Sequence, residues 1–210
     1  MKDVRFAKFV LVVNGVTPLG LLAWDAINGQ LGANPIEFAI RTTGMLTLIF
    51  VLLTLCVTPA RKLLGNNYLS NFRRSLGLLA FFYGSTHFLI YLGFYQSFDF
   101  PAVIHDTVKR PFILFGMTCL FLMTPLAITS TNGMIRRLGA KNWKRLHWLI
   151  YPAAIAAVTH YWLLVKADTR QPRAFAAALV VLLGFRLLMA ARKNRQPVRL
   201  AQTPSGAVNP

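Results

Sequence analysis

Histidines are the side chains of this sequence whose type and setting best suit metal or redox chemistry, and there are four: His87, His105, His147 and His160. His105 has charged neighbours, so we expect it in a solvated loop. The other three lie inside or at the edge of long apolar runs, where an ionisable group is costly and usually functional. No HExxH motif, Ser/His/Asp grouping or acidic pair accompanies them there. Neutral imidazoles without nearby acids favour haem over zinc or a di-metal site.

His87 and His160 are predicted to lie at nearly the same depth in a membrane. His87 is twelve residues after Ser75, about 18 Å along a helix axis, and His160 is fourteen residues after Leu146, about 21 Å. If these runs are the third and fifth of six membrane-crossing helices, both enter from the same side. Imidazoles from two facing helices at equal depth can supply both axial ligands of one haem iron. A hydrogen-bonded core role is the alternative for either histidine alone.

His147 lies thirteen residues before His160, about 20 Å away along a helix, which is the offset of two haems stacked across a bilayer. On an ideal helix, however, the two side chains point about 140° apart. The level on the third helix that would complete a second ligand pair is occupied by Arg73 and Arg74, and neither can ligate iron. The sequence therefore leaves open whether one or two haems bind.

Three arginines are candidate binding residues for an anionic group of a cofactor. Arg73 and Arg74 precede the third apolar run, and Arg186 lies within the last one. Topology and snorkelling to the membrane surface explain most cations in such places. The functional interpretation is a salt bridge to a haem propionate or to the phosphate of a flavin. It applies most strongly to Arg186, because this residue lies within an apolar run.

The segments that must position these side chains are long and apolar. The chain has 210 residues, of which 55% are hydrophobic and 14% are charged, whereas about a quarter of the residues of a soluble domain are charged. A transmembrane helix needs about 20 apolar residues. Six segments meet or approach that length: residues 9–27, 42–58, 75–95, 112–130, 146–166 and 174–191. They are continuous rather than alternating in polarity, which indicates helices and not a barrel.

We therefore predict an all-α fold, a six-helix transmembrane bundle formed by residues 1–195 and followed by a disordered cytoplasmic tail, 196–210. The first segment is the weakest, since Asn14, Gly15 and Pro18 interrupt it, and it resembles a signal peptide. Its apolar stretch is long and its cleavage pattern is poor, so we interpret it as a retained helix.

The distribution of charge predicts the orientation. Of the 23 Lys and Arg residues, sixteen fall on one side of the six helices and six on the other, which also holds five of the six acids. The positive-inside rule then places both termini in the cytoplasm. The net charge of +17 could indicate a nucleic-acid partner, but that function requires basic residues along one soluble face. Here they form short clusters between apolar runs, so we expect no nucleic acid.

Four stretches of the chain resemble a known family. RRSLGLLAFFYGSTHFLIY (73–91), LAITSTNGMIRRLGAKNWKRLHWLIY (126–151) and IAAVTHYWLLVK (155–166) are similar to the haem-binding membrane subunit of the periplasmic methionine sulfoxide reductase system, the MsrQ or YedZ family. NGQLGANPIEFAIRTTG (28–44) is similar to the first external loop of that family. Its wider relatives are ferric reductase-like transmembrane domains, including NADPH oxidases and metalloreductases.

The resemblance implies a multi-pass b-type haem subunit of the bacterial inner membrane. It would pass electrons from the quinone pool or a cytoplasmic flavin reductase to a periplasmic molybdopterin enzyme, which reduces methionine sulfoxide in oxidised proteins. By position, His87, His147 and His160 match the three functional histidines of the family. The resemblance also links the chain to FMN, for which the sequence reveals no site.

Two departures from the NADPH oxidases bear on the mechanism. The third helix carries one histidine where theirs carries two, and no soluble NADPH domain follows the sixth helix. The electron donor must therefore be a separate molecule, and the chain is expected to be an electron conduit without substrate chemistry of its own. The alternatives are a stand-alone ferric or cupric reductase and a non-redox transporter or assembly scaffold. We expect the partner to dock at the acidic external loops, which contain Asp25, Glu37, Asp99 and Asp106.

Overall fold

Helices make up nearly all of residues 2–195, which are the residues that the computed structural model describes. Their bounds are α1 Lys2–Ile27, α2 Pro35–Leu63, η1 Asn67–Phe72, α3 Arg73–Ile90, η2 Tyr91–Tyr95, α4 Phe100–Lys109, α5 Pro111–Ile128, α6 Asn132–Leu146, η3 His147–Leu149, α7 Ile150–Leu164 and α8 Arg170–Arg195. No strand occurs in this range, so the all-α class is confirmed. The predicted tail, 196–210, lies outside the described residues.

Five of the six predicted membrane spans have the length and hydropathy that a crossing requires. They are Val4–Ile27, Pro35–Leu63, Asn67–Tyr95, Pro111–Ile128 and Arg170–Arg192. The remaining predicted segment, 146–166, forms α7, which has only 15 residues because the 3₁₀ turn η3 precedes it. Fifteen residues extend about 22 Å, less than the hydrocarbon core of about 30 Å. The turn η3 continues directly into α7 and lengthens the helical run.

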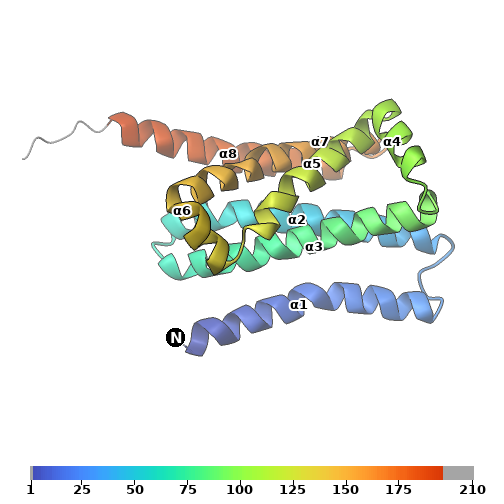
Figure 1. The fold of residues 1–210 in the computed structure, drawn as a ribbon, viewed down its shortest axis with the longest axis horizontal. Helices are drawn as coiled ribbons and strands as arrows, with labels where there is room; N and C mark the ends of the chain where they lie inside the picture. The colour runs from blue at the N-terminus through green and yellow to red at the C-terminus, as the bar shows by residue number, and fades with distance from the viewer. Residues whose placement is uncertain (1, 196–210) are drawn as a thin grey trace, which may run out of the picture.

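The long helices run along one common axis (Figure 1). In Figure 1, α1 lies at one edge, α2 and α3 lie side by side, and α5, α7 and α8 form the other side. The closest pairings are α2 with α3 and α5 with α7. The short helix α4 closes one end of the bundle and α6 the other. The start of α1 and the end of α8 both lie at the α6 end (Figure 1).

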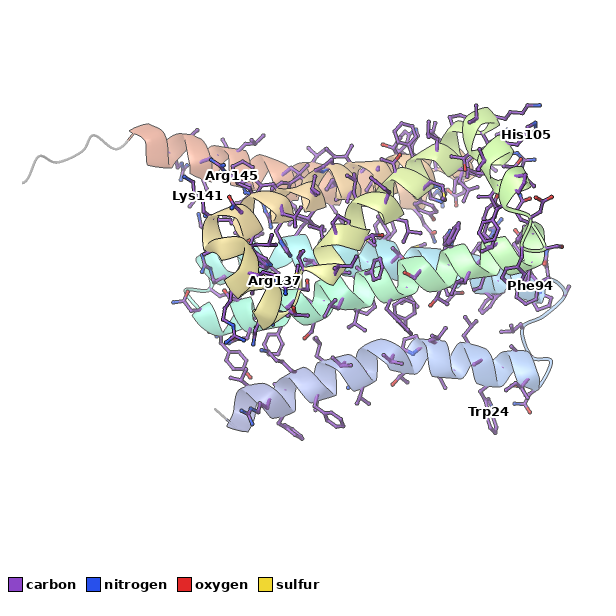
Figure 2. All side chains as sticks on the ribbon, viewed as in Figure 1. Trp24, Phe94, His105, Arg137, Lys141 and Arg145 are labelled. Atoms are coloured by element: carbon purple, nitrogen blue, oxygen red, sulfur yellow. The ribbon has the colours of Figure 1, made fainter. Side chains whose placement is uncertain are left out.

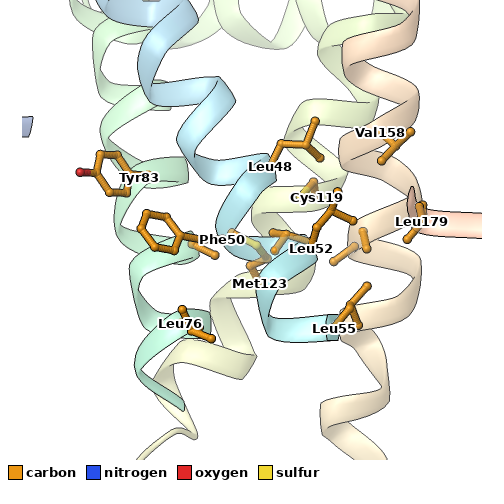
Figure 3. Packing of buried hydrophobic residues seen from close by; sticks show 14 of the residues in the cluster. Leu48, Phe50, Leu52, Leu55, Leu76, Tyr83, Cys119, Met123, Val158 and Leu179 are labelled. Carbon is orange, nitrogen blue, oxygen red and sulfur yellow. The ribbon is translucent and has the colours of Figure 1, made fainter. Parts of the chain in front are cut away.

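The core forms where α2, α3, α5 and α7 meet. Its buried side chains include Val51 and Leu55 of α2, Leu79 of α3, Met123 of α5 and Ala153 of α7. Figure 3 shows how these helices interlock through this cluster. Large apolar side chains also cover the outside of the bundle; Phe121 is 78% exposed and Val180 is 70% exposed. A surface of this kind suits hydrocarbon rather than water as its solvent.

The segment that contains His105 is helical, which corrects the expectation of a loop. Asp99 caps α4 by accepting a hydrogen bond from the backbone N–H of Ala102 at 3.1 Å, and Pro101 lies in the first turn. Both features favour the start of a helix. His105 itself is exposed, as predicted, and lies at the α4 end of the bundle (Figure 2).

One buried hydrogen bond joins α1 to the rest of the bundle. The hydroxyl of Tyr83, a fully buried residue of α3, donates to the backbone carbonyl of Gly15 in α1 at 2.7 Å. Gly15 also faces Leu79 so closely that a Cβ there would lie 2.5 Å from a Leu79 methyl group. Gly15 is one of the residues that interrupt the first apolar segment of the sequence, and in the structure it is where α1 contacts α3.

The Tyr83→Phe variant should unfold more easily than the wild type, because it leaves the Gly15 carbonyl without this donor. We expect a loss of about 1 kcal/mol in the free energy of unfolding, measured by denaturant titration in detergent. Tyr95→Phe is the matched control, since Tyr95 is 52% exposed. Equal stability of the two variants would contradict this role for Tyr83.

Candidate functional site

The structure brings His87 of α3 and His160 of α7 together inside the bundle. Their ring centres are 6.1 Å apart and their planes are nearly perpendicular, at 85°. Both side chains are partly buried between helices that the sequence separates by more than 70 residues. The sequence predicted that the two histidines lie at nearly the same depth, and in the structure their imidazoles are neighbours.

Each imidazole is hydrogen-bonded through Nδ1 to a main-chain carbonyl of a neighbouring helix. Nδ1 of His87 lies 2.9 Å from the carbonyl oxygen of Ile40 in α2, and Nδ1 of His160 lies 2.6 Å from that of Phe112 in α5. A carbonyl oxygen only accepts, so Nδ1 must carry the proton in both rings. Nε2 then keeps its lone pair, and a carbonyl partner of this kind typically orients a metal-ligating histidine.

The 6.1 Å between the ring centres is compatible with both imidazoles holding one metal ion, since two rings that bind a metal from opposite sides, each with its nitrogen about 2 Å from the metal, have centres about 6 Å apart. Residues 4–192, whose side chains the structure describes, contain no group of three or more His, Cys, Asp or Glu side chains that could enclose a metal ion. Two histidine donors suit a macrocycle that supplies the other four ligands, as in a bis-histidine haem.

His147 occupies a different environment. It lies in η3, where its Nδ1 is 3.0 Å from the carbonyl oxygen of Trp143 and its ring stacks on that of Trp143 at 3.8 Å between centres. The structure does not bring His147 to His87 or His160, which agrees with the predicted difference in direction. His147 is half-buried and faces no second imidazole among the described residues.

Arg186 is held inside the bundle by neutral partners. Its Nη1 donates to the hydroxyl of Tyr151 at 2.9 Å, and its Nη2 donates to the carbonyl of Leu55 at 2.5 Å and to the hydroxyl of Thr58 at 3.1 Å. The guanidinium also lies over the Tyr151 ring, 5.2 Å from its centre. The Nε atom of Arg186 is buried and has no hydrogen-bond partner. The main-chain and hydroxyl groups that fix this arginine carry no signal in the sequence.

Arg73 joins Arg186 at the same hydroxyl, because its Nη2 also donates to Thr58. Arg74 points elsewhere and donates to the side-chain oxygen of Asn132 in α6 at 2.8 Å. The structure therefore brings together two of the three predicted arginines and separates the third. We call Arg73, Arg186 and Thr58 the arginine pair site.

Among residues 4–192, whose side chains the structure describes, no carboxylate forms an ion pair with the arginine pair site. The ion pairs in this range join Glu37 to Arg41, Asp106 to Arg110 and Asp168 to Arg170. All of these residues belong to the external loops predicted from the sequence. A buried guanidinium that keeps its charge requires compensation, and two together without an acid favour an anion.

The arginine pair site and the histidine pair are two separate centres. His87 lies fourteen residues after Arg73, and α3 is a continuous helix between them. Fourteen residues extend about 21 Å along the axis, so the two residues lie at different levels of α3.

Sequence reasoning identified the histidines but missed their acceptors. Ile40 and Phe112 act through their carbonyl oxygens, and the apolar side chains reveal nothing of this. Thr58 and Tyr151 were also missed, because a hydroxyl near the end of an apolar run is common. Only the packing of α2 on α3 and α8, and of α7 on α5 and α8, identifies these partners.

Comparisons with known proteins indicate what this site belongs to. The family model described as "Ferric reductase like transmembrane component" matches residues 43–158, a segment that includes His87 and His147 and ends two residues before His160. Similar proteins named "Protein-methionine-sulfoxide reductase heme-binding subunit MsrQ" occur in Rhodospirillum rubrum, 47% identical over 191 residues, and in Herminiimonas arsenicoxydans, 46% identical over 198 residues. The alignments cover 91% of this chain and 92% of the first relative, and 93% and 91% for the second. No solved structure shows significant similarity to the chain.

Proposed function

Because the chain belongs to the MsrQ family of heme-binding subunits of protein-methionine-sulfoxide reductase, within the ferric reductase-like transmembrane proteins, we propose that it carries electrons across a membrane through haem b. The observation that carries this proposal is the His87–His160 pair, with ring centres 6.1 Å apart and both Nδ1 atoms at main-chain carbonyls. Each Nε2 is thereby available as an axial ligand.

In this proposal the protein holds and orients the haem, and the haem supplies the redox chemistry. When bound, haem supplies an iron that accepts and releases one electron at a time. His87 and His160 would hold the iron between α3 and α7, and the hydrogen bonds to their carbonyl partners orient the rings. The surrounding apolar helices exclude water, so the charge of the iron would change in a medium of low polarity when it gains or loses an electron.

The ends of the bundle suggest the direction of transfer. Arg137, Lys141 and Arg145 lie at the α6 end, and Trp24, Phe94 and His105 lie at the opposite end (Figure 2). The positive-inside rule makes the α6 end cytoplasmic, together with both termini, in a bacterial inner membrane. We propose that electrons enter there from the quinone pool or a flavin reductase. They leave at the α4 end for the periplasmic molybdopterin enzyme that reduces methionine sulfoxide.

Three of the four acidic residues proposed for docking of that enzyme, all but Asp25, already have local roles. Asp99 caps α4, Glu37 pairs with Arg41, and Asp106 pairs with Arg110. A docking role is therefore additional to these contacts. We propose that the partner covers the end formed by α4 and the loop that precedes α2.

The arginine pair site is proposed to bind an anionic group near the electron entry. Arg73 and Arg186 share Thr58 and lack a carboxylate among the described side chains, and Arg73 lies about 21 Å from His87 along α3. The phosphate of FMN fits this chemistry, since guanidinium forks match phosphate oxygens. The propionate of a second haem, with His147 as a ligand, is the alternative occupant.

The haem content of purified protein tests the ligand pair. The wild type should bind haem, and His87→Ala and His160→Ala should each lose it, because one imidazole cannot hold the iron in a bis-histidine site. His105→Ala is the matched control, since His105 is exposed, and it should keep the wild-type ratio. Loss of one further haem only in His147→Ala would establish a second site. A colourless wild type after haem-supplemented expression would refute the electron-transfer function and leave the scaffold or transporter function.

Flavin content tests the arginine pair site. Arg73→Gln and Arg186→Gln should lower the FMN-to-protein ratio of protein purified with FMN, while the haem of the His87–His160 site remains. Arg192→Gln changes an exposed arginine of the same helix as Arg186 and should have no effect. If both variants instead lose one haem of two and keep their FMN, the anion is a propionate.

Reduction of ferric chelates separates a conduit from a stand-alone reductase. Membranes that contain this chain but lack the periplasmic reductase should reduce added ferric chelates no faster than membranes without the chain. The physical reason is that His87 and His160 are partly buried and each is hydrogen-bonded to the main chain of a neighbouring helix, which restricts the access of an external chelate to a haem held there. A rate that rises with the amount of the chain would favour a ferric reductase.

A further inference from the structure

The two histidine hydrogen bonds share one construction. The acceptor is the carbonyl of residue i in a neighbouring helix, and residue i+4 of that helix is glycine: Ile40 with Gly44 in α2, and Phe112 with Gly116 in α5. In an α-helix the carbonyl of residue i points towards the N–H of residue i+4. An imidazole that donates to that carbonyl must therefore lie against the Cα of residue i+4.

Both glycines leave a space that the imidazole occupies. A Cβ at residue 44 would lie 3.0 Å from Nδ1 and from Cε1 of His87. A Cβ at residue 116 would lie 2.9 Å from Nδ1 and 3.1 Å from Cε1 of His160. These distances are shorter than the contact distance of about 3.5–4.0 Å between non-bonded carbon atoms. A methyl group at either position would displace the ring from its carbonyl.

Backbone conformation does not explain these glycines. The glycines with positive φ are Gly29, Gly32, Gly65 and Gly139, which lie in turns or at a kink. Gly44 and Gly116 are instead inside regular helices, where glycine is less favourable than alanine. Two other helical glycines, Gly77 and Gly184, have no close neighbour; a Cβ at residue 77 would lie 3.9 Å from Thr54, and one at residue 184 would meet nothing within 4 Å.

We infer that Gly44 and Gly116 are positioning residues, one for each proposed haem ligand. Each lets an imidazole approach a main-chain carbonyl closely enough to donate its Nδ1–H, and this fixes the tautomer and the aim of Nε2. The inference rests on the proposed haem binding, which it deepens. In this way α2 influences how strongly His87 of α3 would bind the iron, and α5 does the same for His160 of α7.

The hydrogen bond also affects the iron that the ligand would hold. An Nδ1–H that donates to a carbonyl makes Nε2 more basic, which stabilises the oxidised iron relative to the reduced iron. Displacement of the ring lengthens this bond and makes Nε2 a weaker donor. The reduction potential should then rise, and changes to such supporting partners typically weaken metal binding by about 10- to 100-fold.

The experiment compares Gly44→Ala and Gly116→Ala with Gly77→Ala and Gly184→Ala in the full-length purified protein. All four changes should preserve helix content, since alanine is the better helix former. The measurements are the haem-to-protein ratio, the reduction potential and the low-temperature EPR spectrum of the oxidised haem, with far-UV circular dichroism as the folding control. The first two variants should bind haem more weakly, at a higher potential and with an altered EPR signal, whereas the controls should match the wild type.

The outcomes separate this inference from the proposed function. If the wild type binds haem and Gly44→Ala and Gly116→Ala match it in potential and EPR spectrum, the positioning role is overturned and haem binding stands. If the two variants lose helix content together with haem, the glycines serve helix packing and the inference also fails. A colourless wild type overturns both proposals. Altered spectra at wild-type helix content would support the inference, because a purely structural role does not change the ligand field.

Discussion

The hydrogen bond between a histidine N–H and a main-chain carbonyl of the next helix is the interaction on which the site depends. In an apolar span, a polar N–H without a partner is costly, and water is not there to replace it. A helix carbonyl already accepts from its own helix but has a second lone pair. His87 uses that of Ile40, and His160 uses that of Phe112. Both bonds require close approach of helices, which is what the α2–α3 and α5–α7 pairings supply.

These two helix pairs also explain why the core is placed where it is. Val51 and Leu55 of α2, with Ala153 of α7, are among the most deeply buried residues, and they join one pair to the other. The histidines face each other across the same junction. Small residues let the backbones approach, and apolar packing then holds the approach in place. Packing and ligand geometry are therefore set by the same contacts.

Charge is organised separately, at the ends of the bundle. Carboxylates pair with arginines in the external loops, whereas Arg73 and Arg186 share Thr58 and have no carboxylate among the described residues. The distance along α3 divides the molecule into an inner histidine centre and an arginine pair site. His147 stacks on Trp143 and belongs neither to the histidine pair nor to the arginine pair site.

The sequence alone determined the all-helical class, most of the spans and the depth of His87 and His160, because hydropathy and the rise per residue of a helix are local properties. It also identified the family from the stretches around these histidines, which the similarity to MsrQ subunits confirms. It did not foresee that α7 is shortened by η3 or that His105 is helical, since a 3₁₀ turn and a cap depend on few residues. Only the tertiary structure decided which arginines meet at Thr58 and which carbonyls receive the imidazoles. Every residue has the same main-chain carbonyl. Helix packing therefore decides which carbonyl accepts a hydrogen bond from an imidazole, and the type of the side chain does not reveal it.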